Sequence, residues 1–191
     1  MNIKIFFFIL VVILRILIKN LIPYNRISWE LSRNLINFNN KYILNLSKEI
    51  IGNKNVFDEN GVIFISNHYN VTDVLMLYGC LNEDTYTVSK SDLLSYVGIK
   101  NKLINKIFFK GTNSISYIRN DLNSGNKVKK KMLKNLNNNN NVLIFPEGTS
   151  TRNGYPNKFK NGLFKFAAEN YIPIIPLTLK YKRQIGIKKG D

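Results

Sequence analysis

Five short apolar runs, separated by stretches with helical periodicity, constrain the fold of this chain more than any other feature. Runs this short suit strands buried in a sheet rather than helices. Strands that alternate with helices are typical of α/β proteins. The predicted strands are Val62–Ile65, Thr85–Val88, Ser114–Ile118, Val142–Phe145 and Ile174–Leu179. We therefore expect one α/β domain that contains a mixed sheet flanked by helices.

The length and net charge of the chain indicate how many domains it forms and which kinds of partner it binds. A chain of 191 residues with 45% hydrophobic residues can form one domain with a substantial core. Its net charge of +16 favours anionic partners: nucleic acid, an acidic membrane surface or phosphorylated small molecules. The single cysteine, Cys80, excludes an internal disulfide and fits a reducing or cytosol-facing compartment.

The N-terminal region, residues 1–23, is a predicted membrane-associated hydrophobic segment. Ile5–Ile18 is apolar at every position except Arg15, and the apolar character continues weakly to Pro23. This length is close to the lower limit for a span, so a short span, a leaflet-embedded helix and an uncleaved signal anchor all remain open. Basic residues are concentrated at the end of this segment and beyond it, which predicts that the body of the protein faces the cytosol.

Residues 24–51 carry apolar side chains at steps of three or four, which predicts an amphipathic helix of about six turns. The apolar positions are Ile27, Leu31, Leu35, Phe38, Tyr42, Leu46 and Ile50. Gly52 follows them and is suited to ending a helix. Such a helix can lie on a membrane surface or pack against the domain, and both alternatives remain open.

His68 is the only histidine of the chain, and it falls between the predicted strand Val62–Ile65 and a predicted helix that Thr72 can cap and that contains the apolar run Val74–Tyr78. Connections of this kind place side chains at the rim of a sheet, where ligands bind in α/β proteins. Asp73 lies in the first turn of the helix, where the helix dipole favours an ionised carboxylate. A carboxylate that holds the second nitrogen of a histidine keeps it in the tautomer that acts as a general base. His68 and Asp73 are therefore a candidate catalytic pair, although this spacing also arises by chance.

A second polar turn follows the strand Val142–Phe145. Pro146 ends the strand, and Glu147 places a carboxylate at its carboxyl end. Gly148 removes a side chain where backbone could approach a ligand, and Thr149 offers a hydroxyl group and an amide. The alternative is an ordinary polar turn.

Taken together, these stretches resemble the lysophosphatidate and glycerol-phosphate acyltransferase family across roughly residues 50 to 180. Four motifs occur in the order typical of that family. The first is Asn67 and His68 followed by Asp73; the second is Gly111, Ile115, Ile118 and Arg119; the third is Phe145–Thr149, with Phe159, Lys160 and Gly162 downstream; the fourth is Pro173–Pro176.

The resemblance implies an acyltransferase domain over residues 52–191. His68 would take a proton from a hydroxyl group of the acceptor, and Asp73 would orient its imidazole. Arg119 would bind the phosphate of the acceptor. The complete set of implied substrate-binding residues is Asn67, Arg119, Glu147, Gly148, Thr149, Arg152 and Lys160. The resemblance implies acyl-CoA as a co-substrate and neither a metal nor a cofactor.

The resemblance also implies the substrates. The expected reaction transfers a fatty acyl group to 1-acyl-glycerol-3-phosphate and gives phosphatidate at a membrane, without nucleic acid as a partner. Ser150 stands where many family members have arginine, so other acceptors remain open: glycerol 3-phosphate or another lysophospholipid. A non-catalytic basic protein that binds membrane or lipid is the remaining alternative.

Overall fold

A five-stranded sheet forms the centre of the molecule. The computed structural model describes residues 10–11, 13–14, 16–18, 26–46, 48–70, 72–82, 84–92, 95, 101–119, 121–151 and 155–181. The strands are β1 (Ile63–Ser66), β2 (Thr85–Lys90), β3 (Ser114–Tyr117), β4 (Asn141–Ile144) and β5 (Ile174–Leu177). Their order across the sheet is β3-β2-β4-β1-β5, and every neighbouring pair is parallel.

The α/β class and all five predicted strands are confirmed, with strand ends that differ from the prediction by at most two residues. The expectation of a mixed sheet was wrong. A helix lies between each strand and the next one in the sequence. Such a crossover brings the chain back to the end of the sheet where the previous strand began, so the next strand runs in the same direction. The intervening helices are α3 (Thr72–Tyr78), α4 (Lys102–Gly111), α5 (Leu122–Asn137) and α6 (Gly162–Glu169).

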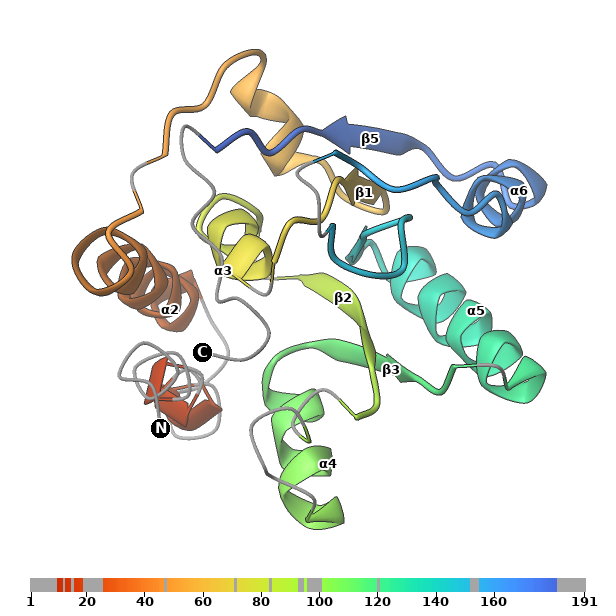
Figure 1. Ribbon diagram of the computed structural model, residues 1–191, viewed down its shortest axis with the longest axis horizontal. Coiled ribbons are helices and arrows are strands. Elements are labelled where there is room, and N and C mark those ends of the chain that lie inside the picture. Colours follow the sequence, from red (N-terminus) through yellow and green to blue (C-terminus); the bar gives the residue numbers. More distant parts are fainter. Residues whose placement is uncertain are drawn as a thin grey trace.

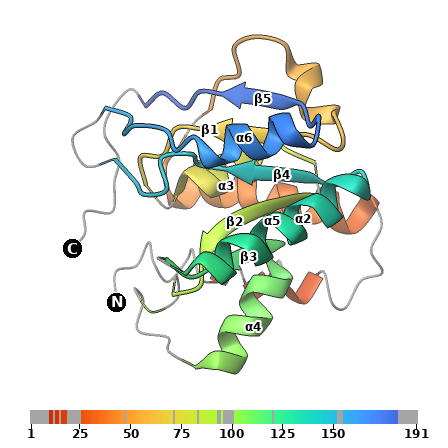
Figure 2. The ribbon, with the colours of Figure 1, turned by 90° about the vertical axis from the view of Figure 1, so that its right-hand side faces the viewer.

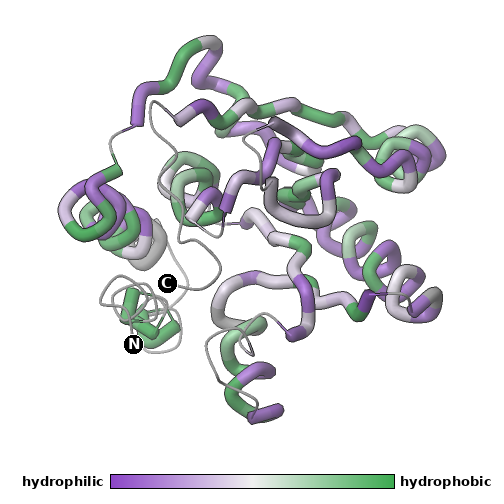
Figure 3. Tube along the Cα trace, viewed as in Figure 1, coloured by the Kyte–Doolittle hydropathy of each residue, from purple (hydrophilic) through white to green (hydrophobic). Residues whose placement is uncertain are grey.

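Helices cover both faces of the sheet. Figure 2 shows α5 and α6 in front of the sheet, with α3 and the helix α2 (Arg26–Phe38) behind it. The buried core on the first face joins β1, β3 and β4 to α5 and α6. On the other face, Phe64 of β1 and Leu143 of β4 pack with Leu77 of α3. Hydrophobic and hydrophilic positions alternate along α5 in Figure 3, as expected for a helix with one face on the core.

The amphipathic helix predicted over residues 24–51 is shorter than expected. After α2 the chain forms a single wide turn, η1 (Asn39–Ile43), with the Leu44 amide bonded to the Asn39 carbonyl at 3.0 Å. Asn45 has a left-handed backbone (φ 53°), which ends the helical path well before Gly52. Leu44 and Leu46 nevertheless lie in the same buried cluster as α3. Among the predicted apolar positions whose burial the structure describes, only Leu46 is buried, and it reaches the core without helical backbone. Leu31, Phe38 and Tyr42 of the same predicted stripe are exposed.

The predicted membrane segment lies partly outside the described residues, which exclude 1–9 and 19–25 along with Arg15. The residues of this segment that are described, from Leu10 to Ile18, are helical. Val11 is buried with Ile36 of α2, whereas Ile13 and Leu17 are exposed. Within the part of the chain that the structure describes, no helix has both the length and the apolar character needed to cross a membrane.

Candidate active site

The sheet topology brings the two polar turns together. Strands β1 and β4 are parallel neighbours, with Ile65 opposite Ile144. Their carboxyl ends therefore lie at the same edge, and His68 and Glu147 follow those ends in the sequence. The chain continues from β1 to α3 on one face and from β4 towards α6 on the other (Figure 1). Adjacent strands whose helices depart to opposite faces form the crevice in which α/β proteins bind ligands.

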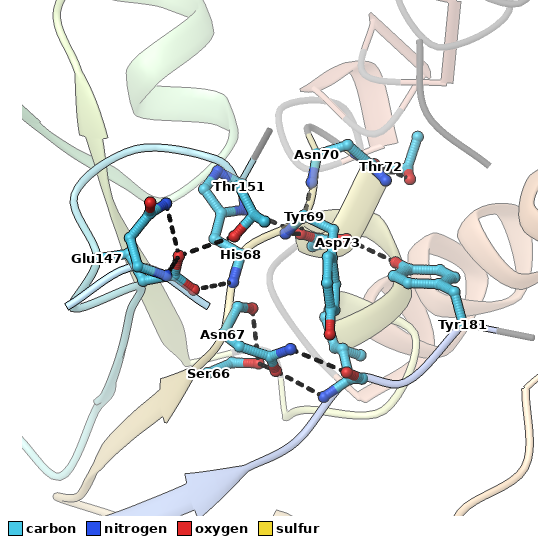
Figure 4. Close-up of polar contacts among 12 residues, drawn as sticks. Ser66, Asn67, His68, Tyr69, Asn70, Thr72, Asp73, Glu147, Thr151 and Tyr181 are labelled. Atoms are coloured by element: carbon cyan, nitrogen blue, oxygen red, sulfur yellow. Dashed lines mark hydrogen bonds and ion pairs between the residues drawn. The ribbon is translucent and has the colours of Figure 1, made fainter. Parts of the chain in front are cut away.

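Asp73 organises the loop that carries His68. Its carboxylate is fully buried, and Oδ2 accepts hydrogen bonds from the backbone amides of Tyr69 at 2.6 Å and Asn70 at 2.9 Å. The same oxygen lies 2.9 Å from Nδ1 of His68 (Figure 4). A carboxylate partner makes Nδ1 the protonated nitrogen, which leaves the lone pair on Nε2. The histidine is thus held in the form that accepts a proton.

The imidazole plane is set by a second contact. The ring of His68 stacks on the ring of Phe145, with centroids 4.3 Å apart and planes 25° from parallel. Phe145 directly follows β4, so this contact joins the two turns. With Nδ1 bonded to Asp73 and one face against Phe145, the ring has little freedom to rotate. Its side chain is 19% exposed and so remains accessible.

Glu147 joins three segments behind His68. It is buried, and its Oε1 accepts the backbone amide of His68 at 2.7 Å. Its Oε2 accepts the Thr151 hydroxyl at 2.9 Å and two Asn157 donors, the backbone amide at 2.7 Å and the side-chain amide at 3.0 Å. The backbone amide of Thr151 in turn donates to the His68 carbonyl at 2.7 Å. These bonds hold the His68 loop against the turn after β4.

Asn67 binds the chain that follows β5. Its side-chain amide donates to the Leu179 carbonyl at 2.9 Å, and its Oδ1 accepts the Leu179 amide at 2.8 Å. These two hydrogen bonds resemble the backbone pairing between neighbouring strands, and they fix the path of the chain just before Tyr181. The Tyr181 hydroxyl donates to Oδ1 of Asp73 at 2.6 Å. Tyr181 is not among the residues predicted for the site, because no motif or spacing relates it to Asp73.

The phenol of Tyr181 is a persistent donor. Burial raises the pKa of Tyr181 well above its ordinary value, and the negative charge of Asp73 raises this pKa further. Tyr181 therefore stays protonated across the physiological pH range, and its hydroxyl hydrogen remains available to Asp73.

Two cationic side chains meet at the loop after β4. The Arg119 guanidinium donates to the Gly148 carbonyl at 2.8 Å. Gly148 has a left-handed backbone (φ 68°), and a Cβ added there would lie 2.7 Å from Nζ of Lys160. Thr149, the next residue, is exposed. Arg119 and Lys160 thus place positive charge beside an open turn, which suits the binding of a phosphate group. Arg152 lies outside the described residues.

Two curated proteins are similar to this chain in sequence. A 1-acyl-sn-glycerol-3-phosphate acyltransferase of Cocos nucifera is 27% identical over 125 residues, which are 64% of this chain and 38% of that protein. The human 1-acyl-sn-glycerol-3-phosphate acyltransferase beta is 27% identical over 140 residues, 72% of this chain and 48% of that protein. The chain thus spans less than half the length of these curated relatives.

A solved structure has a similar fold, and a family model matches the sequence. The crystal structure of the 1-acyl-sn-glycerophosphate (LPA) acyltransferase PlsC from Thermotoga maritima superposes with a TM-score of 0.62 at 17% identity, over 91% of this chain and 70% of that one. The model of the acyltransferase family matches residues 47–180. That stretch contains all five strands and both turns of the site, so the chain belongs to the acyltransferase family.

Proposed function

We propose that this protein transfers a fatty acyl group from acyl-CoA to the free hydroxyl group of 1-acyl-glycerol-3-phosphate and so forms phosphatidate. The observation that carries the proposal is the His68–Asp73 pair at the crevice between β1 and β4, with Nδ1 and Oδ2 2.9 Å apart. Membership of the acyltransferase family supports the reaction class, and the names of the relatives support the acceptor.

The chemistry follows from the state of the imidazole. Nε2 of His68 accepts the hydroxyl proton as the acceptor oxygen attacks the thioester carbonyl, and Asp73 stabilises the imidazolium. When the tetrahedral intermediate collapses, the new ester bond remains, the carbon–sulfur bond breaks, and the proton passes from His68 to the sulfur of coenzyme A. The chain needs no acyl-enzyme for this sequence.

The remaining predicted site residues fall into two groups in this proposal. Arg119 and Lys160 bind phosphate beside Gly148 and Thr149, and Arg152 stays a prediction for the same role. Asn67 and Glu147 act through the loops, because their side chains bond to Leu179, His68, Thr151 and Asn157.

A membrane surface is the proposed place of reaction. Leu103, Ile104 and Ile107 of α4 are exposed at 65%, 47% and 49%, with exposed Lys102 and Lys106 on the same helix. Apolar side chains next to lysines suit the surface of an anionic leaflet. The net charge of +16 and the apolar residues 1–23 favour the same location, with the catalytic domain on the cytosolic side.

The test is acyl transfer from labelled oleoyl-CoA, measured in membranes from cells that express the full chain and in membranes from cells that carry an empty vector. Lysophosphatidate, glycerol 3-phosphate and lysophosphatidylcholine are supplied in parallel. We expect the chain to increase label in phosphatidate with lysophosphatidate as acceptor. Label with another acceptor alone would correct the substrate, and no increase with any acceptor would refute the proposed activity.

Replacing Arg119 by alanine should raise the KM for lysophosphatidate by about tenfold or more, since charge-assisted hydrogen bonds to phosphate are lost. The kcat should change less, because Arg119 lies away from the reacting atoms in this proposal. Steady-state kinetics over a range of acceptor concentrations measure both. Lys129→Ala, an exposed position on α5, is the matched control for loss of one positive charge. An unchanged KM in Arg119→Ala would remove Arg119 from the phosphate site.

A further inference from the structure

Tyr181 contacts the buried carboxylate of Asp73 from a distant part of the chain. The two residues are 108 positions apart, and Tyr181 lies one residue beyond the stretch 47–180 that matches the family. The Oδ2 atom of Asp73 is occupied by His68 and by two backbone amides. The Tyr181 hydroxyl bonds to the other oxygen, Oδ1, at 2.6 Å.

We propose that Tyr181 is a positioning residue for the His68–Asp73 pair: its hydroxyl group fixes the Asp73 carboxylate and moderates the negative charge that faces the imidazole. The inference rests on the proposed role of His68 as the general base. A hydrogen bond to an ionised group is stronger than one between neutral groups, and it draws charge away from the acceptor. Tyr181 therefore influences how readily His68 takes up its second proton.

The phenol is held in place from two directions. The two bonds between Asn67 and the Leu179 backbone fix the chain two residues before Tyr181. The ring of Tyr181 meets the ring of Tyr69 edge to face, with centroids 5.5 Å apart. Since the Tyr69 amide itself donates to Asp73, the aromatic contact and the carboxylate network support one another. A phenol constrained in this way loses little conformational entropy when its hydroxyl group forms the hydrogen bond to Asp73.

The surroundings support a neutral phenol as the donor. The titratable groups near its hydroxyl are Asp73 in the first turn of α3 and Tyr69 in the preceding loop, and both raise the pKa of Tyr181 in addition to burial. Among the described groups that shift the pKa of this phenol, the Asp73 carboxylate to which it donates is the one that carries a charge.

The test compares the full-length wild-type chain with Tyr181→Phe, which keeps the ring and removes the hydroxyl group. We expect kcat to fall by about tenfold and KM for both substrates to stay within about twofold, because the substrate contacts are intact. The acid limb of the pH profile of kcat/KM should move by about half a unit to higher pH, because the uncompensated carboxylate holds the imidazolium more strongly. Tyr171→Phe, at a side chain that is 95% exposed, is the matched control.

A second readout does not depend on activity. His68 is the only histidine of the chain, so its ring signals can be followed by NMR during a pH titration without overlap from other histidines. The titration midpoint should shift upward in Tyr181→Phe and stay unchanged in Tyr171→Phe. If Tyr181→Phe does not fold, the solvent exchange rate of the Tyr181 hydroxyl hydrogen is measured in the wild-type chain instead. Slow exchange supports the hydrogen bond to Asp73, and fast exchange overturns it.

The outcomes separate this inference from the proposed function. An active wild-type chain with unchanged rates and an unchanged titration midpoint in Tyr181→Phe would overturn the role of Tyr181 alone. A wild-type chain inactive with every acceptor would refute the proposed function, and the NMR midpoint would then decide whether Tyr181 acts on the His68–Asp73 pair.

Discussion

Replacing His68 by alanine should lower the rate of acyl transfer by about 10²–10⁴-fold, the contribution typical of a general base. The variant keeps the binding groups at Arg119 and Lys160 but has no group that accepts the hydroxyl proton. The fold should survive, because Asp73 keeps its bonds to the amides of Tyr69 and Asn70 and to the Tyr181 hydroxyl.

Initial rates with labelled oleoyl-CoA and lysophosphatidate measure the loss, at matched protein level in membranes. Thermal unfolding of the purified protein in detergent checks the fold, and Tyr171→Phe provides a variant with no expected effect on either. A His68→Ala protein that keeps more than about a tenth of the wild-type rate would contradict general-base catalysis by this residue.

Replacing Asp73 by asparagine should lower kcat by a similar amount, about 10²–10⁴-fold, since loss of the carboxylate beside a catalytic histidine removes both the tautomer preference and the charge that stabilises the imidazolium. Three donors converge on Oδ2: Nδ1 of His68 and the amides of Tyr69 and Asn70. The asparagine oxygen must therefore occupy that side. Its amide group then faces the Tyr181 hydroxyl, which has to become the acceptor.

The same substitution should also reduce stability, because Tyr181 must find a new acceptor for its hydroxyl hydrogen in a buried site. We expect the free energy of unfolding to fall by about 1–3 kcal/mol, the cost of a buried polar group left without its partner. Urea unfolding measures this loss, and steady-state kinetics measure kcat.

The double variant Asp73→Asn with Tyr181→Phe isolates the route by which Tyr181 acts. If Tyr181 acts through the carboxylate, its removal should lower kcat no further once the carboxylate is gone. Independent losses that add up in the double variant would show that Tyr181 affects the reaction by some other path.

Local patterns were sufficient for the five strands and for the contact between His68 and Asp73. The apolar runs predicted all five strands, because a buried strand needs apolar side chains whatever its neighbours are. The five-residue spacing of His68 and Asp73 places them on one loop and the first turn of the following helix. Their contact at 2.9 Å is therefore local in the sequence. The groups that further hold the pair, on Phe145, Glu147 and Tyr181, come from distant segments.

Local patterns failed where backbone path or direction depended on distant packing. The apolar stripe over residues 24–51 predicted one core-facing helix, but Leu31, Phe38 and Tyr42 of that stripe are exposed, and Leu46 is buried. The stripe did not distinguish a continuous helix from α2 followed by a wide turn and a non-helical segment, an arrangement that buries Leu44 and Leu46. The apolar runs carry no mark of strand direction by themselves. The parallel arrangement follows from the helices between successive strands, which the sequence pattern does contain.

What the sequence by itself determined is the α/β class, the five strands, the acyltransferase motifs and the His68–Asp73 pair, since each is encoded by side chains close together in the chain. Only the tertiary structure decided that Glu147 bonds to the His68 backbone and that Tyr181 bonds to Asp73. These contacts join residues 79 and 108 positions apart. They exist because β4 and β5 both pair with β1, and strand order is a property of the whole packed sheet.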